Sequence, residues 1–158
     1  MSYYVHDLSP FAWQFSPGFG IRWYGLAYAA GLLIAWWMLI RLCRQSLITL
    51  SAKARADYIF YLMLGVIIGG RLGFMLFYDF AAFIQNPLLF FQFQRGGMSS
   101  HGGFLGVMVT CLIFSRRHRF PLLTLFDITC ILTPAGLLLG RLANFVNGEL
   151  WGKVAIVP

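Results

Sequence analysis

The chain has 158 residues, of which 59% are hydrophobic, 18% aromatic and only 11% charged, and its formal net charge is +7. Soluble domains carry about 25% charged residues, so this composition excludes an ordinary soluble protein. Several stretches reach the roughly 20 apolar residues that are needed to cross a bilayer, and we predict one transmembrane domain over residues 1–158, an all-α polytopic membrane bundle.

The first half of the chain predicts an interfacial segment followed by two membrane spans. Residues 1–21 are rich in aromatic residues, proline and glycine, and we expect a short amphipathic element and a turn at the interface. The first spanning helix is predicted at about 23–42 and the second at about 58–78. The second contains a small-xxx-small pattern, which lets another helix approach closely. This pattern consists of Gly65, Gly69 and Gly73.

The second half predicts two further spans. Residues 80–95 are aromatic but too short and too broken around Pro87 to cross the bilayer, so an interfacial or half-inserted element on the outer side is expected. A short third span is predicted at 98–115. The fourth is predicted at about 122–142, with a kink at Pro134. The sequence therefore predicts about four transmembrane helices with interfacial elements on the outer side.

Positive charge collects in two short loops, one after the first predicted span and one after the third. Inserted helices keep such residues on the cytoplasmic side, so we predict that the N-terminus, residues 79–98 and residues 143–158 face outward. This placement explains the basic balance better than a nucleic-acid partner does, and we expect none. The loop residues are Arg41, Arg44, Lys53 and Arg55, and then Arg116, Arg117 and Arg119.

Four polar residues follow one another closely at the end of the last apolar segment, where polar groups are costly unless they have partners or a function. They are Arg141, Asn144, Asn147 and Glu149. The guanidinium of Arg141 offers a planar fork that binds phosphate through two parallel hydrogen bonds. The alternative is an anchor that extends to the headgroups. We interpret the group as a site for a polar headgroup, in which Glu149 orients Arg141 or holds a hydroxyl. The alternative for Glu149 is a solvated carboxylate in a loop.

Three further residues are candidates, each with a structural alternative. Arg71 lies deeper in an apolar helix, where it must meet a carboxylate, backbone carbonyls, water or a lipid phosphate; substrate contact and structural pairing are both open. His101 can accept a proton near neutral pH, and the glycines that follow it let backbone or ligand come close, but packing or capping is the alternative. Tyr24 can bind a headgroup or serve as an interfacial aromatic residue.

Other site classes find no support. The three cysteines, Cys43, Cys111 and Cys130, are isolated and lack zinc-ligand or redox spacing. The sequence has no GxSxG, Walker or HExxH motif. We therefore expect neither a metal nor a cofactor. A transporter is disfavoured because the polar groups gather at one face and not at the membrane midplane.

Three motifs resemble those of one family. Gly140–Gly152 satisfies every fixed position of G-R-x-[GA]-N-F-x-N-x-E-x-x-G, the signature of the phosphatidylglycerol–prolipoprotein diacylglyceryl transferases of the bacterial inner membrane. His101-Gly102-Gly103 resembles the family's His-Gly-Gly element. An early Arg-x-Tyr-Gly element is matched by Arg22, Tyr24 and Gly25. The resemblance covers about residues 15–158.

The resemblance implies transfer of a diacylglyceryl group from phosphatidylglycerol to the thiol of the lipobox cysteine in the prolipoprotein signal peptide. This is the first step of bacterial lipoprotein maturation, and glycerol-1-phosphate is the second product. By the resemblance, Arg141 binds phosphate and His101 is the candidate base. The residues that would shape the site are Tyr24, Asn144, Glu149 and Gly152, to which we add Arg71 and Asn147 as candidate substrate-binding residues.

The implied partners are phosphatidylglycerol, the prolipoprotein signal peptide and the bilayer itself. Family members are usually longer, so we expect this chain to correspond to an N-terminal portion of the family. A different class stays open at this point: a lipid-binding or scaffold membrane protein that holds phosphatidylglycerol without turning it over.

Overall fold

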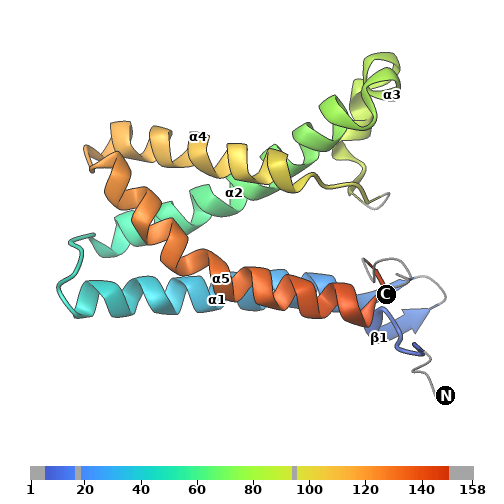
Figure 1. Ribbon diagram of the computed structural model, residues 1–158, viewed down its shortest axis with the longest axis horizontal. Helices are drawn as coiled ribbons and strands as arrows, with labels where there is room; N and C mark the ends of the chain where they lie inside the picture. Colours follow the sequence, from blue (N-terminus) through green and yellow to red (C-terminus); the bar gives the residue numbers. More distant parts are fainter. Residues whose placement is uncertain (1–5, 17–18, 94–95, 150–158) are drawn as a thin grey trace, which may run out of the picture. The chain divides into compact units, whose positions relative to one another are not determined.

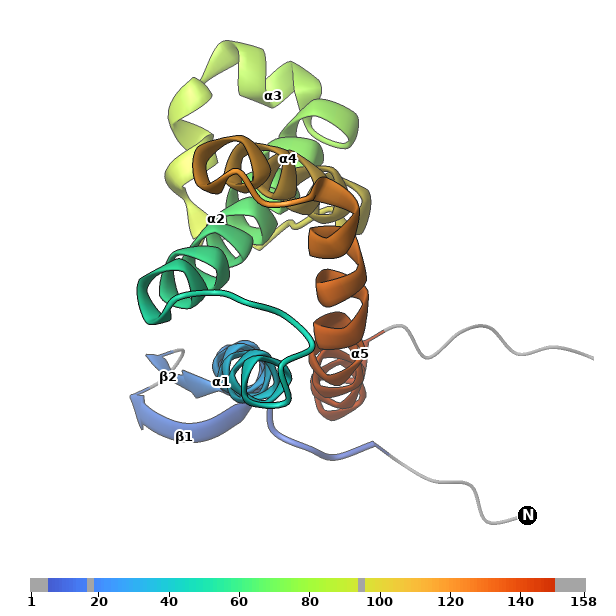
Figure 2. The ribbon, with the colours of Figure 1, turned by 90° about the vertical axis from the view of Figure 1, so that its left-hand side faces the viewer.

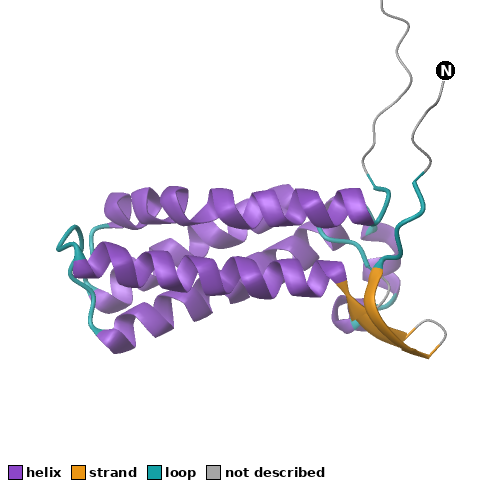
Figure 3. Cartoon of the chain, turned by 90° about the horizontal axis from the view of Figure 1, so that it is seen from below, coloured by secondary structure: helices purple, strands orange, loops and turns teal. Residues whose placement is uncertain are grey.

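The computed structural model describes residues 6–16, 19–93 and 96–149. Helices make up most of this part of the chain, and one hairpin precedes them (Figure 3). The elements are β1 (Phe11–Ser16), β2 (Phe19–Arg22), α1 (Trp23–Arg44), α2 (Ala52–Phe77), α3 (Phe80–Gln85), the 3-10 helix η1 (Pro87–Phe91), α4 (Ser100–His118) and α5 (Leu122–Val146) (Figure 1). The chain forms two compact units, residues 1–38 with 132–158 and residues 39–131. A single domain over the whole chain stays a prediction.

Three helices of the described chain, α1, α2 and α5, are long and apolar enough to cross a membrane. They confirm the first, second and fourth predicted spans. The predicted third span is also helical, as α4, but it is shorter, at 19 residues. Because α4 begins with polar and small residues and ends with Arg116, Arg117 and His118, it is less apolar than the other three. The all-α class is confirmed, and the count of four spans is approximate.

The segment before α1 forms an antiparallel hairpin, with Trp13 opposite Ile21 and Gln14 opposite Gly20. The sequence predicts an amphipathic element and a turn here, and it misses the strands themselves. The backbone N–H of Trp23 donates to the carbonyl of Pro10 at 3.2 Å, which fastens the hairpin to the first residue of α1. Residues 80–93 contain the short α3 and η1, neither of which is long enough to cross a bilayer, in line with the prediction.

In the second unit, α2 and α4 pack closely against each other (Figures 1 and 2). Glycines line both sides of this contact and leave no room for side chains: a Cβ on Gly73 would lie 2.6 Å from the Cα of Gly102. A Cβ on Gly69 or Gly106 would also collide with the backbone of the other helix. The small-xxx-small prediction for α2 is confirmed, and α4 supplies the matching glycines.

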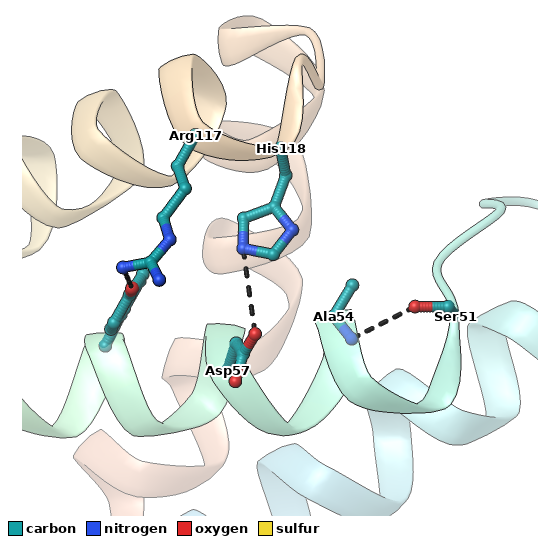
Figure 4. A network of polar contacts seen from close by, with 6 residues as sticks. Ser51, Ala54, Asp57, Arg117 and His118 are labelled. Atoms are coloured by element: carbon teal, nitrogen blue, oxygen red, sulfur yellow. Dashed lines mark hydrogen bonds and ion pairs between the residues drawn. The ribbon is translucent and has the colours of Figure 1, made fainter.

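Polar contacts join α2 and α4 at the end of the pair where α2 begins (Figure 4). Ser51 caps α2, since its hydroxyl accepts the N–H of Ala54 at 3.2 Å. Arg117 of α4 donates to the Tyr61 hydroxyl at 2.6 Å, and His118 lies 3.8 Å from the carboxylate of Asp57.

A buried hydroxyl in the second unit joins α2, α4 and the first turns of α5. Tyr58 of α2 has no exposed surface, and its hydroxyl donates to the carbonyl of Leu125 in α5 at 2.9 Å. The same oxygen lies 2.7 Å from the Thr129 hydroxyl and 3.6 Å from the sulfur of Cys111 in α4. Because every polar atom of this cluster meets another, the cluster is a structural link between the helices.

Candidate active site at the end of helix α5

The last turn of α5 ends in a Schellman motif. The N–H of Gly148 donates to the carbonyl of Phe145 at 3.1 Å, and the N–H of Glu149 donates to that of Asn144 at 2.9 Å. Gly148 has φ +66°, the left-handed conformation that this motif requires and that glycine adopts without strain. The turn therefore ends α5 and fixes the backbone position of Glu149.

This turn places Glu149 against the start of α1. The Tyr24 hydroxyl donates to Oε2 of Glu149 at 3.1 Å, and the Asn147 amide donates to Oε1 at 3.4 Å. In the same unit α1 and α5 pack closely, since a Cβ on Gly31 would lie 3.2 Å from the Cα of Gly136. Two segments more than a hundred residues apart thus supply one polar cluster.

Arg141 and two asparagines surround this cluster. Arg141 is exposed and lies one turn before Asn144 on the same face of α5. The Oδ1 atoms of Asn144 and Asn147 are buried, and neither has a hydrogen-bond partner within the described part of the chain. Buried acceptors are nearly always paired, so these two oxygens are suited to receive a donor such as a ligand hydroxyl.

The structure adds a residue that sequence reasoning missed. The ring of His6 lies 3.0 Å, at Nε2, from the carbonyl oxygen of Val146, and it packs edge-on against Phe145 with centroids 5.8 Å apart. A Cβ on Gly148 would lie 3.1 Å from this ring. His6 therefore covers the Schellman turn from the N-terminal segment. No motif or periodicity connects position 6 with position 146, so the sequence held no signal for the contact.

His101 belongs to the other unit and is exposed in the first turn of α4. Ser99 caps this helix by accepting the N–H of Gly102 at 3.2 Å. Of the two glycines after His101, Gly102 packs directly against α2. Gly103 is open, since a Cβ there would lie 4.0 Å from its nearest neighbour, the carbonyl oxygen of Val66. The first glycine is thus explained by helix packing, and the second is not.

Arg71 also lies in the second unit, and only 1% of its surface is exposed. Its guanidinium is bound by backbone carbonyls of the segment that precedes α4. Of the eight predicted site residues, four come together at the end of α5: Tyr24, Asn144, Asn147 and Glu149. Arg141 lies one turn before Asn144 on the same helix. His101 and Arg71 stay predictions of a role in the site, and Gly152 lies outside the described residues.

The sequence profile described as prolipoprotein diacylglyceryl transferase matches residues 10–158. The chain belongs to this family. A phosphatidylglycerol–prolipoprotein diacylglyceryl transferase of Coxiella burnetii is 49% identical over 158 residues, which are 100% of this chain and 60% of that protein. Proteins with the same description from Xanthomonas oryzae pv. oryzae and Agrobacterium fabrum are 46% and 41% identical, over 95% and 96% of this chain and 51% and 56% of their own lengths.

Family membership and the apolar helices together make this a multi-pass helical membrane protein of a transferase family. The chain spans about half to three-fifths of the length of the curated relatives that it matches. The family match covers both units, including the cluster at the end of α5 and the first turn of α4.

Proposed function

We propose that the protein transfers the diacylglyceryl group of phosphatidylglycerol to the lipobox cysteine thiol of prolipoproteins. Membership of the diacylglyceryl transferase family is the observation that carries this proposal. The polar cluster at the end of α5 supports it, because a carboxylate, a hydroxyl and two amides gather there beside an exposed arginine. These groups suit a ligand that carries both a phosphate and hydroxyls.

The proposed reaction forms one bond and breaks another. The cysteine sulfur attacks a glycerol carbon of phosphatidylglycerol, and a thioether forms. The bond between that carbon and the phosphate oxygen breaks, and its electron pair leaves with glycerol-1-phosphate. The thiol proton passes to a base, because the thiolate and not the thiol is the strong nucleophile.

The residues divide this work by their chemistry. Arg141 binds the phosphate and stabilises the negative charge that collects on it as the bond breaks. His101 is the proposed base, since an imidazole accepts a proton near neutral pH. The amide oxygens of Asn144 and Asn147 accept hydroxyl groups of the headgroup, and Glu149 fixes Tyr24 and Asn147 in place.

The proposed location is the bacterial inner membrane with the N-terminus on the outer side. The basic residues of the α1–α2 loop and of the end of α4 support this orientation, because such residues stay in the cytoplasm. The end of α5 then faces the outer surface, where the signal peptide of a translocated prolipoprotein is within reach.

The test is transfer from radiolabelled phosphatidylglycerol to a lipobox peptide in membranes that contain this chain. Replacing the exposed Arg141 by Ala is expected to lower the rate about 100-fold or more, the usual effect of removing one group that stabilises transition-state charge. Arg116→Ala, a change at another exposed helical arginine, is the matched control and should leave the rate unchanged.

Each result leads to a distinct conclusion. Thioether product that disappears in Arg141→Ala and persists in Arg116→Ala supports the transferase and the role of Arg141. Product that persists in Arg141→Ala contradicts that role. Labelled lipid that is retained without any product would favour the alternative, a membrane protein that binds phosphatidylglycerol without turning it over.

A further inference from the structure

The guanidinium of Arg71 is enclosed by the backbone of the segment that leads into α4. Its Nε donates to the carbonyl of Phe90 at 3.1 Å. Nη2 donates to the carbonyls of Leu89 and Gln92 at 2.6 and 3.0 Å. Nη1 donates to the carbonyl of Gly97 at 3.0 Å and also to that of Gly96. An arginine has five N–H donors, so five carbonyls take up the whole set.

The arrangement satisfies both partners. Helix ends leave carbonyls without an intrahelical partner, and η1 ends at Phe91, within the stretch that faces Arg71. Of the carbonyls that bind Arg71, that of Leu89 also accepts the N–H of Gln92 at 3.1 Å. Such carbonyls are costly in an apolar surrounding, as is an unpaired cation. Gly96 and Gly97, whose carbonyls accept from the guanidinium, take φ values of +73° and +84°, a left-handed backbone that glycine adopts without strain. We call Arg71 together with residues 89–92, 96 and 97 the carbonyl cage.

The carbonyl cage leads into the first turn of α4. Beside Arg71, the carbonyl of Gly70 accepts the N–H of Ser99 at 2.9 Å. Ser99 is 5% exposed, and it accepts the N–H of Gly102 through its hydroxyl and that of Gly103 through its carbonyl. His101 lies within this turn. Its backbone therefore lies between Ser99, which is held by the carbonyl of Gly70, and two amides that Ser99 caps. The last carbonyl bound by Arg71 belongs to Gly97, two residues before Ser99.

We infer that Arg71 is a positioning residue: it folds the segment before α4 into the carbonyl cage and thereby fixes the turn that carries His101. With all five donors engaged, Arg71 has none left for a lipid phosphate, so of the two roles left open by the sequence this inference takes structural pairing and not substrate contact. The part that concerns His101 in catalysis rests on the proposed transferase function. The part that concerns the cage does not.

The first test changes the donor set and keeps the charge. Lysine has three donors on one nitrogen and cannot bind carbonyls spread around a planar fork. In Arg71→Lys, we expect the amides of 89–93 and 96–99 and those of Gly102 and Gly103 to exchange hydrogen about tenfold faster or more, with residues 122–131 unchanged. Arg117→Lys, at an exposed arginine with one contact to Tyr61, is the control and should leave all of these amides unchanged.

The second test changes the backbone that accepts the hydrogen bonds and leaves Arg71 in place. Gly96 has open space around its Cα but a left-handed φ, so Gly96→Ala strains the backbone without a steric clash. This variant should accelerate the exchange of the same amides, and in combination with Arg71→Lys it should add little. Effects that add in full, or Gly102 and Gly103 amides that stay protected in both variants, would overturn the inference.

Kinetics then separates positioning from lipid binding. In Arg71→Lys, kcat is expected to fall about tenfold or more while KM for phosphatidylglycerol stays within about twofold, because a displaced reactive group slows the chemical step. A tenfold rise in KM with kcat and amide exchange unchanged would make Arg71 a lipid ligand instead. If the unmodified chain transfers nothing, the proposed function fails, and the exchange data alone still decide whether Arg71 holds the turn of α4.

Discussion

Two arginines of this chain, Arg71 in α2 and Arg141 in α5, lie in apolar helices but differ in their surroundings. Arg71 is 1% exposed, and each of its donors meets a backbone carbonyl. Arg141 is exposed, and beside it the amide oxygens of Asn144 and Asn147 are buried without partners in the described residues. The same side chain thus belongs to a closed polar network in one region and to an open one in the other. In an apolar protein, whether the polar groups of a region all have hydrogen-bond partners distinguishes structural residues from binding-site residues better than residue type does.

We call the part of the second unit in which polar groups are fully paired the closed region, and the polar cluster at the end of α5 the open region. The closed region includes more than Arg71. The Tyr58 hydroxyl meets Leu125, Thr129 and Cys111, and the glycines of α2 and α4 bring the backbones together without space for a ligand. In the open region, one carboxylate receives a hydroxyl and an amide, while two acceptors remain. Substitutions in the closed region should therefore change stability first, and those in the open region should change lipid turnover first.

The largest effect on stability is expected at the glycine contact. A Cβ on Gly106 would collide with the carbonyl of Gly65 in the facing helix, and backbone cannot yield as a flexible side chain does. Gly106→Ala should lower the free energy of unfolding by about 3 kcal/mol, measured by thermal unfolding in detergent followed through helical circular dichroism.

Gly103→Ala is the matched control, on the same helix but with its nearest neighbour 4.0 Å away. It should leave stability unchanged or raise it by up to about 1 kcal/mol, because alanine favours the helix. If Gly103→Ala destabilises the protein as much as Gly106→Ala does, close packing does not explain the glycines of α4.

Substitution of Asn144 is expected to have the opposite effect, with stability preserved and lipid turnover reduced. Replacing it by Ala removes a buried acceptor without a partner in the described chain and improves helix propensity, so the free energy of unfolding should stay the same or rise by up to about 1 kcal/mol. Transfer from phosphatidylglycerol should nevertheless fall about tenfold or more, since a hydroxyl of the bound lipid loses its acceptor. A loss of stability together with unchanged turnover would show that Asn144 belongs to the scaffold.

Much of the fold and of the polar cluster could be predicted from the sequence, because the sequence patterns that indicate them are local. Apolar runs of sufficient length predicted α1, α2 and α5, and the spacing of Gly65, Gly69 and Gly73 predicted a close helix partner. The polar residues of the cluster at the end of α5 follow one another within a few positions. The Schellman turn then only has to direct Glu149 toward Tyr24, whose candidacy came from its own position at the start of α1.

The remaining features depend on contacts that leave no local trace. The partners of Arg71 are backbone carbonyls, which every residue type supplies, so no sequence pattern predicts which residues they belong to. The contact between His6 and Val146 joins positions 140 apart in sequence. The hairpin was missed because its alternation is short and its register shifts between Phe11 and Trp13, which weakens the period-two signal.

The smallest effect on the free energy of unfolding is expected for a polar pair of the second unit that is partly exposed to water. Asp57 and His118 are 3.8 Å apart, with side chains 36% and 22% exposed, so Asp57→Asn should change the free energy of unfolding by about 0.5 kcal/mol or less. The adjacent Tyr58 has no exposed surface, and Tyr58→Phe removes its buried hydrogen bond to the carbonyl of Leu125, which should cost about 1 kcal/mol or more. Thermal unfolding of the two variants compares neighbouring positions on one helix that differ mainly in burial. Equal losses would mean that the number of polar contacts, and not their closure from water, sets the stability of this region.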